Sequence, residues 1–210
     1  MRQEMIKQEG KTMSEHVWNP TIEVESNAGV REVSLLTRHL MKRSVFLTGE
    51  ICMESAMSIL SQLKFLAEES DEEINLYINS GGGEVTAGLL IYDVIQQLKV
   101  PVNMYCTGIA ASMAAVIFAG GQPGRRFILP HSKTMIHEPL ISGGVGGSAS
   151  SIKNISDSIL ETRKLLNGIL VKHTGKTLKE VNKATSFDNY MNAEESIAFG
   201  LCDAVVDSIF

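Results

Sequence analysis

The chain has 210 residues, of which 44% are hydrophobic and 20% charged, with a formal net charge of −5. This length suits one α/β domain with a substantial core. The scattered lysines and arginines of an acidic chain argue against a nucleic-acid partner. We expect no membrane partner, because no run reaches the roughly 18 apolar residues of a spanning helix. The high hydrophobic content predicts apolar surface that faces other subunits.

The N-terminal segment is polar and does not resemble a secretory signal, which favours a cytoplasmic location. We predict that residues 1–18 form a flexible or processed extension. The three cysteines, Cys52, Cys106 and Cys202, contain no Cys-x-x-Cys pair, which argues against a disulfide framework and against a zinc site. We therefore expect no metal and no cofactor on this chain.

Helix-type and strand-type patterns alternate through the first half of the chain. The predicted elements, in order, are a helix over Leu35–Met41, a strand over Ser44–Gly49, a helix over Glu54–Ala67, a strand over Ile74–Asn79 and an amphipathic helix that ends at Gln97. Alternation of this kind predicts a parallel sheet with right-handed crossovers.

A glycine-rich run, Ser80–Gly88, joins a predicted strand to a predicted helix. Glycines there let backbone N–H groups approach a ligand closely. The run lacks the Gly-Lys-Ser/Thr ending of a phosphate loop and the Gly-x-Gly-x-x-Gly spacing, so nucleotide binding is a weak interpretation. The other interpretation is that these N–H groups stabilise an oxyanion.

One serine, Ser112, precedes a run of small and apolar residues. Val102–Thr107 alternates like a strand, Gly108 is expected to end it, and the helix that follows is expected to stop at Gly120. An oxygen nucleophile at the start of that helix would have backbone donors nearby for a developing negative charge. The alternative is a buried helix whose serine is a small, satisfied polar residue.

Downstream, residues 134–137 are expected to form a short strand that is closed by Pro139. His137 lies at its end, where it could act as a general base. It could instead be a hydrogen-bonded core histidine. His131 and His173 compete for the role, but His131 follows a proline in a predicted turn, and His173 lies at a predicted helix end.

A long helix is predicted over Ile152–Thr174, after a glycine-rich stretch at 142–151. Apolar residues line one of its faces: Ile152, Ile155, Ile159, Leu165, Leu166, Ile169 and Leu170. No internal repeat is visible.

Six landmarks in order resemble the proteolytic subunit of the Clp protease (ClpP), a serine peptidase that encloses its active sites in a chamber. They are the sequences that begin at Leu76 (LYINSGGG), Ala87 (AGLLIYD), Gly108 (GIAASMAA), Met135 (MIHEPL), His173 (HTGK) and Ala193 (AEESIAFGL). The resemblance extends from about Asn19 to Asp207.

The resemblance implies a crotonase-like ClpP fold, with repeated β-α-β units and a protruding handle helix at about 150–174, in a single domain over 19–210. Residues 19–30 would be the axial-pore segment. The chain, or a paralogue of it, would form stacked heptameric rings. An AAA+ unfoldase of the ClpX, ClpA or ClpC type would deliver unfolded polypeptides and would itself use the ATP.

The resemblance also assigns site residues. Ser112 would be the nucleophile and His137 its base. Asp188 would fix the imidazole and stabilise its protonated form. The oxyanion donors would be the backbone N–H groups of Gly82 and Met113.

Two residues are candidates for the wall of an unfoldase docking pocket. Tyr77 lies on a predicted strand, and Leu63 lies on the apolar stripe of the helix before it. Ordinary core packing is the alternative for both. Three other aspartates, Asp157, Asp203 and Asp207, are expected to be solvated surface charges.

The chain departs from the family pattern at four places. Gly81 stands where a proline is usual, Glu138 where a glutamine is usual, and Ser186 and Phe187 where an Asp-Arg pair usually links the two rings. The glycine-rich stretch at 142–147 also makes the segment between His137 and Asp188 about two residues longer than expected.

Two other functions fit parts of the pattern. A crotonase-type acyl-CoA enzyme would use paired N–H donors, but it would need no Ser-His-Asp set. A ClpP-like ring partner without activity would build the chamber while a sister subunit cuts.

Overall fold

The computed structural model describes residues 20–26, 29–141, 143–144 and 146–209. The chain divides into two compact units, 1–42 and 43–210. This boundary falls within the range 19–210 that the sequence predicts as one domain. The predicted extension at 1–18 lies outside the described residues.

The first unit contains a β-hairpin and a short helix. Strands β1 (Thr21–Ser26) and β2 (Gly29–Ser34) pair antiparallel. Helix α2 (Leu35–Met41) follows directly, as predicted. Its N-terminus is capped by Ser34, whose hydroxyl accepts a hydrogen bond from the Thr37 N–H at 3.0 Å.

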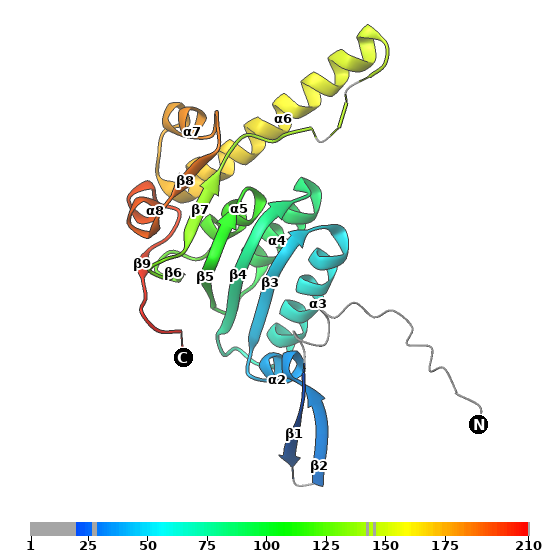
Figure 1. The fold of residues 1–210 in the computed structure, drawn as a ribbon, viewed down its shortest axis with the longest axis vertical. Helices are drawn as coiled ribbons and strands as arrows, with labels where there is room; N and C mark the ends of the chain where they lie inside the picture. Colours follow the sequence, from blue (N-terminus) through cyan, green and yellow to red (C-terminus); the bar gives the residue numbers. More distant parts are fainter. Residues whose placement is uncertain (1–19, 27–28, 142, 145, 210) are drawn as a thin grey trace, which may run out of the picture. The chain divides into compact units, whose positions relative to one another are not determined.

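The second unit is a mixed α/β fold with a largely parallel sheet, as the sequence predicts (Figure 1). Its elements in chain order are β3 (Ser44–Ile51), α3 (Met53–Glu69), β4 (Ile74–Gly83), α4 (Val85–Gln97), β5 (Val102–Ala111), α5 (Met113–Ala119), β6 (Arg126–Ile128), β7 (Lys133–Ile136), α6 (Ala149–Thr174), α7 (Leu178–Ala184), β8 (Asn189–Met191), α8 (Ala193–Phe199) and β9 (Ala204–Val205).

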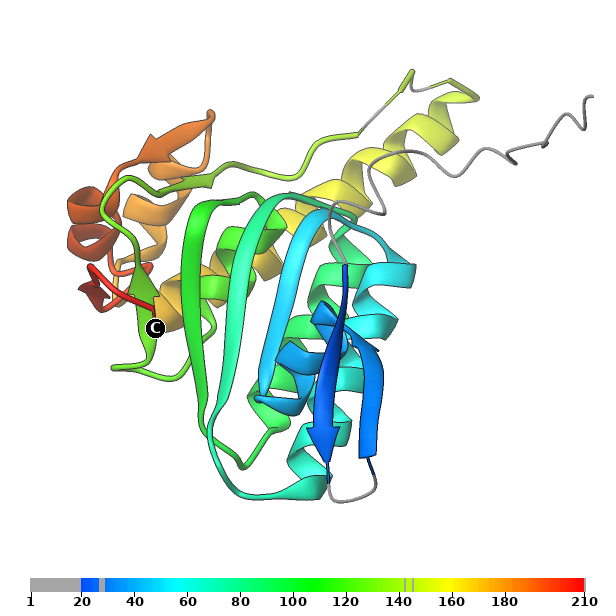
Figure 2. The ribbon, with the colours of Figure 1, turned by 60° about the horizontal axis from the view of Figure 1, so that its bottom comes forward.

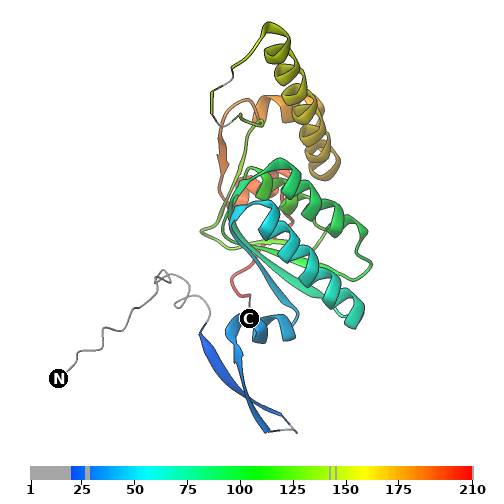
Figure 3. The same ribbon diagram turned by 90° about the vertical axis from the view of Figure 1, so that its right-hand side faces the viewer.

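The sheet has the parallel order β3-β4-β5-β6-β9. Strand β7 pairs with the end of β5 in parallel and with β8 antiparallel. Helices α3, α4 and α5 pack on one face of this sheet (Figures 2 and 3). The carboxyl ends of the parallel strands therefore meet at one edge, which is where α/β folds place their sites.

The core lies between the sheet and these helices. Along β4, Ile74, Leu76 and Ile78 are fully buried, and alternate residues point to the other face. Helix α3 packs Leu63 and Leu66 into the same core. The placement of Leu63 in a docking wall is therefore wrong: its side chain is fully buried, so it contributes to the core and presents no surface to a partner.

The opposite face of the sheet carries a row of stacked aromatic rings. Phe46, Tyr77, Tyr105 and Phe127 occupy matched positions on four adjacent strands. Neighbouring ring centroids are 5.1, 5.2 and 5.2 Å apart. All four side chains are half-buried. Partial burial next to Tyr77 raises the pKa of the Tyr105 hydroxyl.

Strands β4 and β5 run further than predicted, through glycines. The expectation that Gly108 ends its strand is wrong, because β5 continues to Ala111. Gly108 has φ +141°, and a Cβ there would lie 2.6 Å from Asn79 Oδ1. The Asn79 side chain occupies that space and accepts a hydrogen bond from the Ile109 N–H at 3.2 Å. The amide thus supports the strand across the glycine.

The two halves of α6 lie in different surroundings. Leu166, Ile169 and Leu170 of its C-terminal half are buried. The N-terminal half projects beyond the sheet (Figure 1), where Ile152 is 44% and Leu160 is 54% exposed. Among the described residues, no helix combines the length and apolarity needed to cross a membrane.

Candidate active site

Ser112 occupies a sharp turn between β5 and α5. Its backbone has φ 54° and ψ −123°, an unfavourable conformation for a residue with a side chain. Three backbone hydrogen bonds hold it there: its N–H donates to the Met135 carbonyl at 2.8 Å, and its carbonyl accepts from the N–H groups of Ala115 and Val116 at 3.0 and 3.2 Å. Strained turns of this kind present a serine hydroxyl outward at the end of a strand.

His137 reaches Ser112 because β5 and β7 pair in parallel. Ala111 is in register with Met135, so the two strands end side by side. His137 comes directly after β7. Its Nε2 lies 2.8 Å from Ser112 Oγ, which is hydrogen-bond distance for a base and a nucleophile. The imidazole is 15% exposed.

Asp188 is placed by the antiparallel pairing of β7 with β8. The last pair in register is Ile136 with Asn189, so the residue before β8 lies opposite the residue after β7. Asp188 Oδ1 is 3.0 Å from His137 Nδ1. Beyond the two strands, the Glu138 N–H donates to the Thr185 carbonyl at 2.7 Å and so joins the segment after β7 to the segment before β8.

The structure thus brings together the three residues that the sequence predicts as a catalytic set. The competing histidines lie elsewhere: His131 is exposed, and His173 Nε2 is 2.8 Å from the Tyr92 hydroxyl. Burial lowers the pKa of His173.

The other aspartates were expected to be solvated, and for Asp203 this expectation is wrong. Its side chain is 21% exposed and forms a two-point ion pair with the buried Arg126. Burial opposes ionisation of Asp203, but hydrogen bonds from Arg126 and from the Gly124 N–H outweigh it and hold its pKa below the ordinary value. Asp157 pairs on the surface with Lys153, and Asp207 is exposed.

The predicted oxyanion donors lie beside Ser112. Gly82 has φ +92°, and a Cβ there would be 2.6 Å from the Ala111 oxygen and 2.7 Å from Ser112 Cβ. Only a glycine lets the loop approach the serine so closely. The N–H of Met113 is the first of α5, where backbone donors have no intrahelical acceptor.

Ser80 is a supporting residue that the sequence interpretation missed. Its hydroxyl donates to the Gly49 carbonyl at 2.5 Å and accepts from the Gly82 N–H at 3.1 Å. The pairing of Glu50 with Gly82 adds to this support, so the glycine segment is held without the usual proline at position 81. The sequence did contain a signal for a buried role of Ser80, because position 80 continues the alternation of buried residues at 74, 76 and 78.

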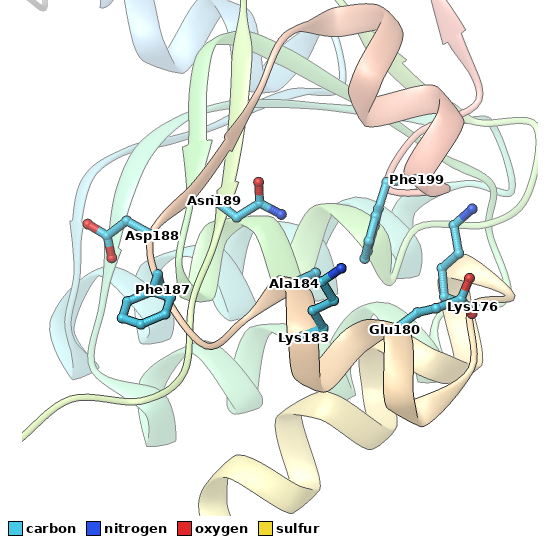
Figure 4. A pocket seen from close by; sticks show the side chains of 8 residues that line it. All are labelled: Lys176, Glu180, Lys183, Ala184, Phe187, Asp188, Asn189 and Phe199. Carbon is cyan, nitrogen blue, oxygen red and sulfur yellow. The ribbon is translucent and has the colours of Figure 1, made fainter.

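Two hollows flank the hydrogen-bonded set. An apolar groove of about 410 Å³ is lined by Val85, Pro139, Leu140, Ile141, Asn154, Ile155, Ser158, Ile159 and Thr162. A pocket of about 510 Å³ lies between α7 and the start of β8 and has Asp188 at its rim. Figure 4 shows the Asp188 carboxylate turned away from Phe199 on the far side of this pocket.

Among the residues that the structure covers, no group of three or more His, Cys, Asp or Glu side chains is placed to hold a metal ion.

In serine hydrolases of several folds, a serine on a strained turn is hydrogen-bonded to a histidine, and that histidine is hydrogen-bonded to an aspartate. The same arrangement is present here. The family model described as Clp protease matches residues 27–209, and the chain belongs to this family. The resemblance inferred from the six sequence landmarks is thereby confirmed.

Proposed function

We propose that this chain is a serine endopeptidase that hydrolyses unfolded polypeptides. The observation that carries the proposal is the continuous set of contacts from Ser112 Oγ through His137 to Asp188, at 2.8 and 3.0 Å. Ser112 Oγ attacks the peptide carbonyl while His137 Nε2 takes its proton and passes it to the leaving amine, which leaves an acyl-serine. Water, deprotonated by the same imidazole, then cleaves this ester, and the proton returns to Ser112 Oγ. Asp188 holds the imidazole and stabilises its protonated form.

The tetrahedral intermediate carries a negative oxygen, which the N–H groups of Gly82 and Met113 stabilise in this proposal. The Gly82 N–H bonds to Ser80 Oγ at 3.1 Å, a long and neutral hydrogen bond. An oxyanion is a stronger acceptor than a hydroxyl, so this donor turns toward the substrate as charge develops.

The apolar groove supports a preference for an apolar substrate side chain. Two of its lining residues follow the site closely along the chain: Pro139 comes two residues after His137, and Val85 comes three residues after Gly82. Ile155 and Ile159 of α6 form its other wall. We expect cleavage after a residue with an aliphatic side chain of moderate size.

Family membership supports assembly into stacked rings that an AAA+ unfoldase feeds. The exposed N-terminal half of α6 offers an apolar face that a second ring would cover.

The aromatic row offers Tyr77 as a docking residue for the unfoldase. If it is one, Tyr77→Ala should weaken ATP-dependent degradation of a tagged folded protein while peptide hydrolysis by the assembled ring continues. Undiminished degradation by that variant would place the docking pocket elsewhere.

The deciding experiment compares the wild-type chain with Ser112→Ala. We expect the wild type to hydrolyse a fluorogenic peptide with an aliphatic residue before the scissile bond and to label with a fluorophosphonate. Ser112→Ala should lose labelling and about 10⁶-fold in kcat, as other triad serines do. Equal hydrolysis by the two proteins would overturn the proposal.

The same experiment separates the other candidates. A wild-type chain that assembles but neither labels nor hydrolyses would be a ring partner without activity, and the exposure of Asp188 (60% of its side chain) is the observation that favours this alternative. A crotonase-type enzyme would act on a thioester and would not depend on Ser112.

A further inference from the structure

Glu138, the residue after His137, connects three elements. Its backbone N–H donates to the Thr185 carbonyl at 2.7 Å, in the segment that leads to Asp188. Its carboxylate Oε2 lies 2.8 Å from Nε of Arg163, on helix α6. Glu138 is therefore held on two sides: a main-chain hydrogen bond ties it to the segment before Asp188, and an ion pair ties its side chain to α6.

The ion pair is partly withdrawn from water. The side chains of Arg163 and Glu138 are 34% and 37% exposed. Nε of Arg163 is itself shielded from solvent and makes no aligned hydrogen bond, because its N–H is not directed at the carboxylate oxygen. The negative charge of Glu138 at 2.8 Å compensates this partly desolvated cation. A neutral side chain of the same size would leave the cation uncompensated.

We propose that Glu138, through its ion pair with Arg163, is a positioning residue for His137. The inference rests on the proposed peptidase function and deepens it. The pair fixes the backbone directly after the imidazole, so that Nδ1 stays opposite Asp188 and Nε2 stays opposite Ser112. Glutamine, the usual residue of the family here, lacks the charge that this contact uses.

Helix α6 contains a second ion pair that provides a matched control. Lys153 and Asp157 lie one turn apart on the exposed half of the helix, with side chains 73% and 53% exposed. This pair joins α6 only to itself. Asp157→Asn therefore removes an acid from the same helix without touching the segment that carries His137.

The test uses the full chain in its assembled state and compares Glu138→Gln, Arg163→Met and Asp157→Asn. We expect Glu138→Gln and Arg163→Met each to lower kcat on a fluorogenic peptide by about fivefold, the size of a partly buried pair worth about 1 kcal/mol. The fluorophosphonate labelling rate should fall by a similar factor and KM should change little. Asp157→Asn should match the wild type. The exchanged pair, Glu138→Arg with Arg163→Glu, should recover most of the lost kcat.

A second readout reports the position of His137 without requiring turnover. The Nδ1 proton shared with Asp188 should give a low-field nuclear magnetic resonance signal in the wild type, and that signal should weaken or shift in Glu138→Gln but not in Asp157→Asn. Wild-type kcat together with an unchanged signal in Glu138→Gln would overturn the inference. If the wild type itself fails to hydrolyse and label, the proposed function fails, and the proton signal alone then decides the positioning role.

Discussion

The two ends of the Ser112–His137–Asp188 set lie in contrasting surroundings. Around Ser112, the whole of α5 is buried and Gly82 packs closely against the turn that carries the serine. Around Asp188, the carboxylate is 60% exposed, and the adjacent Phe187 is 84% exposed. The serine end is therefore fixed by the packing of this chain alone, whereas the aspartate end is open to solvent.

The cause of the contrast is the position of each residue in the sheet. Ser112 follows β5, which has strands on both sides and helices on one face. Asp188 precedes β8, a strand of three residues that pairs only with β7 among the described strands. A short edge strand provides few contacts to shield a carboxylate.

The largest effect that would test this contrast is that of Asp188→Asn. A carboxylate bonded to the imidazole should be needed for the correct tautomer, and in a triad with a buried aspartate its loss costs about 10⁴-fold in kcat. Because Asp188 is exposed, water competes with it, and we expect a loss of about 10²–10⁴-fold in peptide hydrolysis. Asp207→Asn, at an exposed aspartate elsewhere, is the control. A loss below about threefold would mean that Asp188 does not act on His137 in solution.

The next effect concerns the enclosed end. Gly82→Ala would place a methyl group 2.6 Å from the Ala111 oxygen at a φ of +92°, so the glycine segment must move away from Ser112. Loss of one oxyanion donor costs about 10²–10³-fold in kcat. Gly81→Ala is the matched control, since nothing lies within 4 Å of a Cβ at that position. Kinetics with circular dichroism would check both, and equal kcat values for the two variants would contradict the assigned role of Gly82.

Much of the enclosed end could be predicted from the sequence, because local pattern and position agree there. The alternation at 74–78 and the serine before a small-residue helix indicated the strand and the turn. The extension of β4 through its glycines could not be predicted, because glycine weakens strands in general. Here glycine is required instead: a Cβ on Gly83 would lie 2.2 Å from the Ile51 oxygen.

The open end was harder to predict because it depends on contacts distant in sequence. The longer stretch between His137 and Asp188 left the position of Asp188 undetermined. The structure places the glycine-rich stretch before α6, outside the β7–β8 pairing, so the register is unaffected. Asp203 was placed wrongly because its partner, Arg126, lies 77 positions away. The catalytic roles of Ser112, His137 and Asp188 remain predictions.

A smaller effect should follow a change on the exposed N-terminal half of α6. Ile152 is 44% exposed and, unlike Ile155 and Ile159 further along α6, it does not line the substrate groove. If a second ring covers this end of the helix, Ile152→Glu should weaken self-association by about tenfold or more, since burying an isoleucine contributes about 1.5–3 kcal/mol. Ser150→Glu adds the same charge on the opposite side of the helix. Sedimentation velocity would check this, and a wild-type chain that stays monomeric at micromolar concentration would contradict the assembly.

The smallest effect concerns the residue that joins the two ends. Arg126 donates to the carbonyls of Ala119, His173 and Gly200, at or near the C-terminal ends of α5, α6 and α8. Helix α5 begins next to Ser112, whereas α8 follows β8, the strand that begins directly after Asp188. Asp203 holds the guanidinium in this position through two oxygens. One charged pair therefore connects the enclosed end to the open end, at a site that the proposed chemistry does not use.

Asp203→Asn keeps the shape and one acceptor but removes the charge, so we expect it to lower the free energy of unfolding at pH 7 by about 1 kcal/mol. Peptide hydrolysis at that pH should stay near the wild-type rate. Because the pKa of Asp203 is held below its ordinary value in the folded protein, its charge stabilises the fold above the ordinary aspartate pKa of about 3.9, and this contribution is lost as the pH falls through the folded-state pKa. The gap between wild type and variant should therefore be full at pH 7 and should close under strong acid. Urea unfolding across this pH range would measure it, and a gap that persists unchanged in acid would show that shape rather than charge holds Arg126 between the two ends.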